Sequence, residues 1–158
     1  MTDGGQPFVV VGVDQSSASA AALAWAVGQA ERTRARVRAV AAVEAPPLVA
    51  GGPEIAAGAM AQGLADPEQL TEAAQRWLTD AISALPAQTG AVVERQVVHG
   101  DAATALLEAA TGAELLVLGN HGRGALSGAL AGSVALRCAH HAGCPLVLVP
   151  APENAAGP

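Results

Sequence analysis

The stretch FVVVGVDQSS at residues 8–17 decides the fold of this chain. Its first six residues form an apolar run rich in β-branched side chains, which predicts a strand buried on both faces of a sheet. Asp14 and the serines that follow are residues that commonly precede a helix. Residues 18–30 then continue as an alanine-rich helix, with Trp25 and several alanines expected on its buried stripe.

The same strand-then-helix pattern continues to the end of the chain. Strands are predicted at residues 8–13, 37–43, 92–98, 115–118 and 146–149. The later helices are expected to begin at Asp66-Pro67, at Asp101 and at Gly132-Ser133. Strict alternation of strands and helices predicts a doubly wound α/β fold, with a parallel sheet and helices on both faces.

The polarity of the strands predicts their order in the sheet. Residues 92–98 carry Glu94, Arg95 and Gln96 at their centre, which suits a sheet edge, whereas the first and fourth strands are apolar throughout. A five-stranded sheet of order 3-2-1-4-5 satisfies both observations. Its chain direction reverses between strands 1 and 4, and ligands of such sheets bind at that switch point, beyond the carboxyl ends of the strands.

The length of 158 residues is typical of one domain, so the whole chain is expected to form one, with a core at about 8–150. Residues 45–66 are rich in glycine, proline and alanine and have no sustained period, which predicts a loop insertion. Two interpretations of this insertion are equally favoured, a cover over a ligand and a plain surface loop.

Charge and composition exclude several kinds of partner. The net charge is −6 and aromatic residues make up 2%, so neither a basic face nor stacking platforms are expected for nucleic acid. No apolar run approaches the ~20 residues that cross a bilayer, and the N-terminus does not resemble a signal peptide. We therefore expect a cytoplasmic protein with no membrane contact.

All eight basic residues are arginines, and the absence of lysine excludes three kinds of site. A P-loop needs a lysine on the phosphates, a protein kinase needs one on its third strand, and Schiff-base chemistry needs an amine.

A glycine-rich segment follows the fourth predicted strand, where residues 119–134 read GNHGRGALSGALAGSV. Glycines let the backbone approach a ligand closely, and a helix starting at Gly132-Ser133 offers free N–H groups to an anion. These features predict a phosphate site without lysine. Ser133 suits either a phosphate donor or a helix cap, and Asp14, across the crevice, suits either a ribose contact or a helix cap.

The spacing within this segment resembles a known family. Gly119-x-x-Gly122, nine further residues and Gly132-Ser133 match the G-2x-G-9x-G-(S/T) motif of ATP-binding universal stress proteins. The opening VVVGVD and the ending GCPLVLVP are similar to the same family, so the resemblance covers residues 8–150. One departure is Gln15, where many members have glycine.

The resemblance implies a role for each matching residue. Asp14 and Gly119 would lie near the ribose, and the adenine would be lined by Gly12, Val13 and Val43. The phosphates would be contacted by His121, Gly122, Gly132, Ser133 and Val134. Arg123 would add charge at the phosphates, although an arginine in such a loop is more often solvated. His121 has the alternative of an exposed loop histidine, but phosphate contact is favoured for it.

Zinc ligation and catalysis are two other uses that the remaining polar residues suggest. Cys138, His140, His141 and Cys144 are all possible zinc ligands, but adjacent helical histidines point about 100° apart, so apolar packing of the cysteines is favoured. No catalytic triad or dedicated general base is visible, so no catalytic residue is predicted. Efficient catalysis is not expected.

The function predicted from these observations is an ATP-binding stress-response or signalling module. The alternatives are a slow ATP-hydrolysing enzyme using Mg²⁺, a binder of AMP or cyclic AMP, and a ligand-free interaction protein. The apolar strand at 146–149 lies at a sheet edge in the predicted order, which favours a homodimer joined through this strand.

Overall fold

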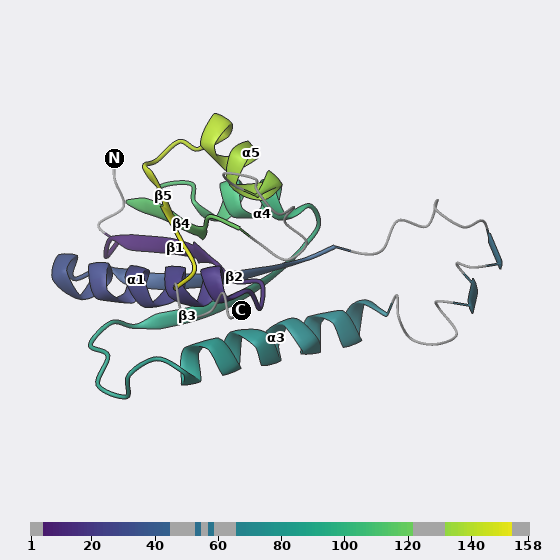
Figure 1. Ribbon diagram of the computed structural model, residues 1–158, viewed down its shortest axis with the longest axis horizontal. Coiled ribbons are helices and arrows are strands. Elements are labelled where there is room, and N and C mark those ends of the chain that lie inside the picture. Colours follow the sequence, from purple (N-terminus) through teal and green to yellow (C-terminus); the bar gives the residue numbers. More distant parts are fainter. Residues whose placement is uncertain (1–4, 45–52, 55–56, 59–65, 122–131, 153–158) are drawn as a thin grey trace.

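The computed structural model describes residues 5–44, 53–54, 57–58, 66–121 and 132–152. Strands and helices alternate along them in the order β1 (Phe8–Gly12), α1 (Ser17–Thr33), β2 (Arg36–Val43), α3 (Pro67–Ser83), β3 (Val93–His99), α4 (Ala102–Ala109), β4 (Leu115–Gly119), α5 (Ser133–His141) and β5 (Leu146–Val149). The strands form one parallel sheet of order β3-β2-β1-β4-β5 (Figure 1). The predicted fold class and strand order are confirmed, and the strand ends differ from the prediction by one residue at most.

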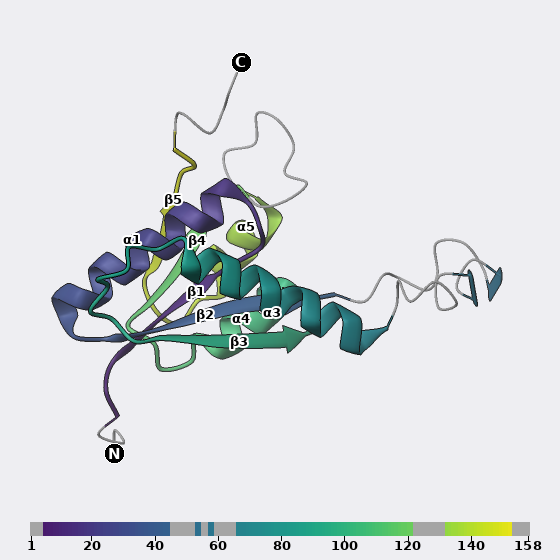
Figure 2. The same cartoon turned by 90° about the horizontal axis from the view of Figure 1, so that it is seen from below.

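The helices form two layers around the sheet. Figures 1 and 2 show α1 and α3 on one face, with α4 and α5 on the other. The central strand β1 has both neighbours in place, and its residues alternate between the two faces: Val9 and Val11 enter one buried cluster, and Val10 enters the other. This alternation explains why β1 is apolar at every position.

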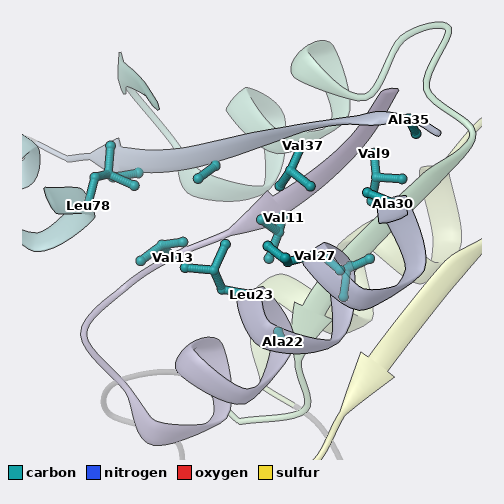
Figure 3. Close-up of a cluster of buried hydrophobic side chains, with 14 of the residues drawn as sticks. Val9, Val11, Val13, Ala22, Leu23, Val27, Ala30, Ala35, Val37 and Leu78 are labelled. Atoms are coloured by element: carbon teal, nitrogen blue, oxygen red, sulfur yellow. The ribbon is translucent and has the colours of Figure 1, made fainter. Parts of the chain in front are cut away.

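The larger cluster lies between the sheet and helices α1 and α3 (Figure 3). Leu23 of α1 and Leu78 of α3 pack there against Val9, Val11 and Val37, and all five side chains are at most 1% exposed. Fully burying one such side chain contributes about 1.5–3 kcal/mol, so this cluster holds both helices on the sheet.

The smaller cluster lies between the sheet and helices α4 and α5. It contains Val10, Leu106 and Leu116, and Cys138 fills a fully buried position beside them. Cys144 packs against the same cluster, and both cysteines are free thiols. Burial raises the pKa of the Cys138 thiol, so it is a protonated apolar group at neutral pH.

The sequence prediction for α1 is wrong mainly in the position of Trp25. It was expected on the buried stripe, yet it is 37% exposed. The buried stripe consists of small residues such as Ala18, Ala22 and Ala26, which let the helix lie close to the sheet. Trp25 precedes Ala26 by one residue and is therefore turned by about 100° to the flank of the helix.

The two edges of the sheet differ in polarity. The β3 edge carries Glu94, whose carboxylate accepts a hydrogen bond from Arg36 of β2 at 2.8 Å, as the polar character of this strand predicted. The β5 edge is apolar, and Leu148 is 39% exposed there. Of the helices in the described part of the chain, none has both the length and the apolarity to cross a bilayer.

Candidate functional site

The predicted switch point lies where β1 and β4 end side by side in the sheet. After β1 the chain enters α1 on one face, and after β4 it reaches α5 on the other. The connections therefore diverge at this edge, which is the place where doubly wound sheets bind their ligands. Gly12 and Gly119 are the last residues of the two strands.

The turn after β1 is built around Asp14. Its Oδ1 accepts hydrogen bonds from the Ser16 backbone N–H at 3.0 Å and from the Ser16 hydroxyl at 2.5 Å. The Asp14 backbone N–H donates to Ser19 Oγ at 3.2 Å. The N-cap of α1 is Ser16, whose Oγ accepts from the Ser19 backbone N–H, so the expectation of Asp14 as a possible cap is wrong. Asp14 instead orders the turn that places its own carboxyl group at the switch point.

Gln15, within this turn, has φ of +71°, which lies in the left-handed region. A side chain there is strained by about 1 kcal/mol relative to glycine. This backbone geometry explains why glycine suits the position, and it shows that the chain adopts the turn with glutamine as well.

The end of β4 lies directly against the first turn of α1. A Cβ atom placed on Gly119 would lie 2.7 Å from the Cβ and the carbonyl carbon of Ala18, and 2.9 Å from the Ser19 nitrogen. Glycine is therefore required at 119 for packing, whatever its contact with a ligand. Through Ser19, the end of β4 is joined to the Asp14 turn.

The backbone of Asn120 brings α5 to the same place. Its carbonyl oxygen accepts a hydrogen bond from Gly132 N–H at 2.7 Å, and its own N–H donates to the Val149 carbonyl. Both ends of the glycine-rich segment are thereby held together at the end of β4. The Asn120 Oδ1 atom is buried and has no hydrogen-bond partner among the described residues, a feature that the sequence analysis missed.

The first turn of α5 presents its N–H groups without a side-chain cap. The N-cap is Gly132, which has no side chain, and Ser133 is the first helical residue and exposed. The alternative that Ser133 caps the helix is therefore wrong, because an N1 residue stands after the cap. A free helix start with an exposed hydroxyl is suited to an anion.

The other predicted site residues are placed differently. Val13 and Val43 are each 5% exposed, and both side chains belong to the cluster beneath α1 and α3. Val134 is partly buried against the cluster beneath α4 and α5, and His121 is half-buried just after β4. Gly122 and Arg123 lie outside the described residues, as does most of the predicted insertion at 45–66.

Comparison of the sequence with models of known protein families assigns the chain to one of them. A model of the universal stress protein family matches residues 8–150. The chain belongs to this family. A universal stress protein of Mycolicibacterium smegmatis is 31% identical over 150 residues, which cover 94% of this chain and 49% of that protein. The chain thus spans about half the length of the curated relatives it matches.

Solved universal stress proteins share the fold. The protein UspA of Lactobacillus plantarum superposes with a TM-score of 0.70 at 19% identity, over 92% of this chain and 99% of that one. A universal stress protein solved in complex with cAMP is 25% identical, with a TM-score of 0.60 over 93% of this chain and 98% of that one.

The four candidate zinc ligands, at 138, 140, 141 and 144, do not form a common metal site. Cys138 is fully buried, whereas the neighbouring His140 and His141 are exposed, with ring centroids 6.4 Å apart. Within the part of the chain that the structure describes, no group of three or more histidine, cysteine or acidic residues is arranged to hold a metal.

An ion pair between α4 and α5 was also missed. Arg137 of α5 donates to Asp101 Oδ1 at 2.6 Å, and Asp101 is the N-cap of α4. The Arg137 guanidinium, with the backbone and hydroxyl donors of Thr104, lowers the pKa of the Asp101 carboxyl to about 2. No local pattern in the sequence signals this pair, because the two residues are 36 positions apart.

Proposed function

We propose that this chain binds an adenine nucleotide at the switch point, with ATP as the expected ligand, and acts as a stress-response or signalling module. The observation that carries the proposal is a continuous set of contacts between three elements. Asp14 contacts Ser19, Ser19 lies against Gly119, and the next residue, Asn120, holds Gly132 at the start of α5. A carboxylate and a free helix start are thereby placed at one edge of the sheet.

The chemistry of each group suits one part of the nucleotide. Carboxylate oxygens accept hydrogen bonds from ribose hydroxyls, and a helix N-terminus attracts phosphate. In this proposal Asp14 and Gly119 lie at the ribose, and the adenine side is formed by Gly12, Val13 and Val43. The phosphate contacts come from His121, Gly122, Arg123, Gly132, Ser133 and Val134.

The choice among adenine nucleotides is part of the proposal. The related protein solved with cAMP supports adenine nucleotide as the ligand class. The glycine spacing is that of ATP-binding members, which favours ATP over AMP and cyclic AMP. Mg²⁺ would accompany ATP, with the Asp14 carboxylate as an oxygen ligand of the kind this ion prefers.

Calorimetric titration with ATP, AMP and cyclic AMP, with and without Mg²⁺, tests this function. Nucleotide carried over from purification is first sought in the supernatant of denatured protein. We expect micromolar or tighter binding of ATP. If none of the three nucleotides binds and none is carried over, the proposal is wrong.

Replacing Ser133 by alanine tests the site itself. Because Ser133 is exposed and is not the N-cap, Ser133→Ala should leave the fold intact and weaken ATP binding roughly tenfold, the loss of one hydrogen bond to a charged group. Ser83→Ala, at the exposed last residue of α3, is the matched control and should bind like the parent protein. Equal affinity of the two variants would place the nucleotide elsewhere.

We also infer a homodimer joined through the outer edge of β5, which follows from three exposed apolar side chains. Leu148 is 39% exposed on β5 itself. Trp25 lies two turns after Ala18, which contacts β4, so it is on the flank of α1 toward β5. Leu136, 52% exposed, is on α5, which leads into β5, and is turned away from the side of Arg137 that faces α4. Such an edge requires a partner strand to avoid aggregation.

A cytoplasmic location stays a prediction of the sequence. It would be tested by fractionating cells that contain the native protein.

A further inference from the structure

The supply of positive charge near the proposed site is small. The chain has eight arginines and no lysine, and seven of the arginines lie in the described residues. Six of these are on α1 and its C-terminal cap, near the start of β2, on α3 or on β3: Arg32, Arg34, Arg36, Arg38, Arg76 and Arg95. Arg137 differs from them because it is on α5, the helix whose first turn faces the switch point.

The geometry of a helix places Arg137 over that first turn. Residues four apart lie on one face, with Cβ atoms about 5–6 Å apart, so Arg137 follows Ser133 on the same side. Side chains on a helix tilt toward its N-terminus, so the long arginine side chain can extend toward Gly132 and Ser133 once it leaves Asp101. A guanidinium in this position can reach an anion bound at the helix start without movement of the helix.

The present partner of Arg137 can be given up at little cost. Its Nη1 donates to Asp101 Oδ1, and the two side chains are 53% and 45% exposed. The cap of α4 uses the other oxygen, because Asp101 Oδ2 accepts from the Thr104 backbone N–H at 2.9 Å and from its hydroxyl at 2.7 Å. An exposed ion pair of this kind contributes little to stability, and the cap persists when Arg137 leaves.

A second carboxylate lies close to this pair. Glu44 Oε1 accepts a hydrogen bond from the Ala102 backbone N–H at 2.8 Å, so Glu44 and Asp101 both stand at the start of α4. One guanidinium thus stands near two carboxylates, so the start of α4 carries a net negative charge. A phosphate chain at α5 would compete with Asp101 for Arg137.

We propose that Arg137 is a phosphate-discriminating residue of the nucleotide site, exchanging its Asp101 partner for the phosphate chain of a bound nucleoside di- or triphosphate. This inference rests on the proposed function. Its consequence is that Asp101 and Arg137 act in opposite directions on affinity. Arg137 strengthens the binding of ATP, and Asp101 weakens it by holding the guanidinium.

Opposite effects of the two substitutions on ATP affinity distinguish this role from that of an ion pair that only holds the two helices together. If the pair only joins α4 to α5, removing either member disturbs the same contact and affects ATP binding alike. Asp101→Asn is a mild change because asparagine caps helices as well as aspartate does. Arg137→Gln removes the charge from an exposed side chain, so both variants should fold.

The experiment measures affinity for ATP and for adenosine by calorimetry in the parent protein, Arg137→Gln, Asp101→Asn and the control Arg76→Gln. We expect Arg137→Gln to weaken ATP binding roughly tenfold, with adenosine unchanged. Asp101→Asn should tighten ATP binding severalfold, and Arg76→Gln, the same charge change on α3, should have no effect. Circular dichroism spectra of the four proteins should coincide.

Two other results overturn the inference in distinguishable ways. In the first, the parent protein binds ATP, but Arg137→Gln has the same ratio of ATP affinity to adenosine affinity as the parent, or Arg137→Gln and Asp101→Asn weaken ATP binding equally. Arg137 then does not contact the phosphates, and the proposed function stands. If the parent protein binds no adenine nucleotide at all, the proposed function fails and the role of Arg137 fails with it.

Discussion

At the scale of single residues, Gly119 has a packing role besides its proposed place at the ribose. The family motif calls for glycine there because of a ligand, but the structure supplies a second reason. The β4 backbone lies against Ala18 and Ser19 of α1, at distances that leave no room for a Cβ atom. The atoms in the way are mostly backbone or the first side-chain carbon, so they cannot rotate aside.

Gly119→Ala is therefore expected to destabilise the fold by about 1–3 kcal/mol, the usual cost of overpacking a close contact. Gly143→Ala is the matched control, since a Cβ there meets no atom within 4 Å, and its effect should stay within about 0.5 kcal/mol. Urea unfolding of both variants measures the difference. Equal midpoints would mean that α1 shifts easily away from β4.

At the scale of elements, α4 and α5 meet through charge as well as through their buried faces. Asp101 begins α4 and binds Arg137 on α5, although the two residues are 36 positions apart in the sequence. The pKa of Asp101, about 2, lies below its ordinary value of 3.8, mainly because of Arg137 and then of Thr104. The ionised carboxylate is thus favoured in the folded state.

This shift predicts a dependence of stability on pH. Because the folded pKa is depressed, the stabilising effect of the Asp101 carboxylate is present above about pH 4 and is lost as the pH falls from there through about 2. Because the pair is exposed, the difference in unfolding midpoint between the parent protein and Asp101→Asn should be small; it should be present above roughly pH 5 and vanish below roughly pH 3. In an Arg137→Gln background the difference should be smaller. A difference that is constant with pH would contradict the assignment.

At the scale of the whole molecule, the two edges of the sheet have different characters. The β3 edge carries charged residues, such as Glu94, which discourage pairing with another strand. The β5 edge is apolar, and the helices of the two faces carry exposed apolar side chains, Trp25 on α1 and Leu136 on α5. The β3 edge therefore suits solvent, and the β5 edge is where the proposed dimer would form.

Leu148→Glu should convert the proposed dimer into a monomer, because it places a charge on the β5 edge. Val92→Glu, next to β3 and 58% exposed, is the control that adds the same charge near the opposite edge and should leave the dimer intact. Light scattering at micromolar concentration measures both. A parent protein that is already monomeric would show that the β5 edge stays unpaired.

The sequence by itself determined the elements and their order. Runs such as FVVVGV favour strands, and the start signals Asp66-Pro67 and Asp101 act on neighbouring backbone groups, so both are local properties. The polar centre of residues 92–98 predicted an edge position for that strand, and the apolar first and fourth strands predicted central positions, as observed. The glycine spacing at 119–133 placed the candidate site after the fourth strand.

Only the tertiary structure decided which side chains meet. Trp25 is exposed because the alanines beside it pack closely on the sheet. Helical spacing alone does not tell which of these residues faces the sheet. Ser133 stands after the cap because the Asn120 carbonyl holds Gly132 at the start of α5. The contact of Gly119 with Ala18 and the pairing of Arg137 with Asp101 join residues far apart in the chain. Such contacts depend on the distance between the helices and the sheet, and local sequence patterns carry no information about that distance.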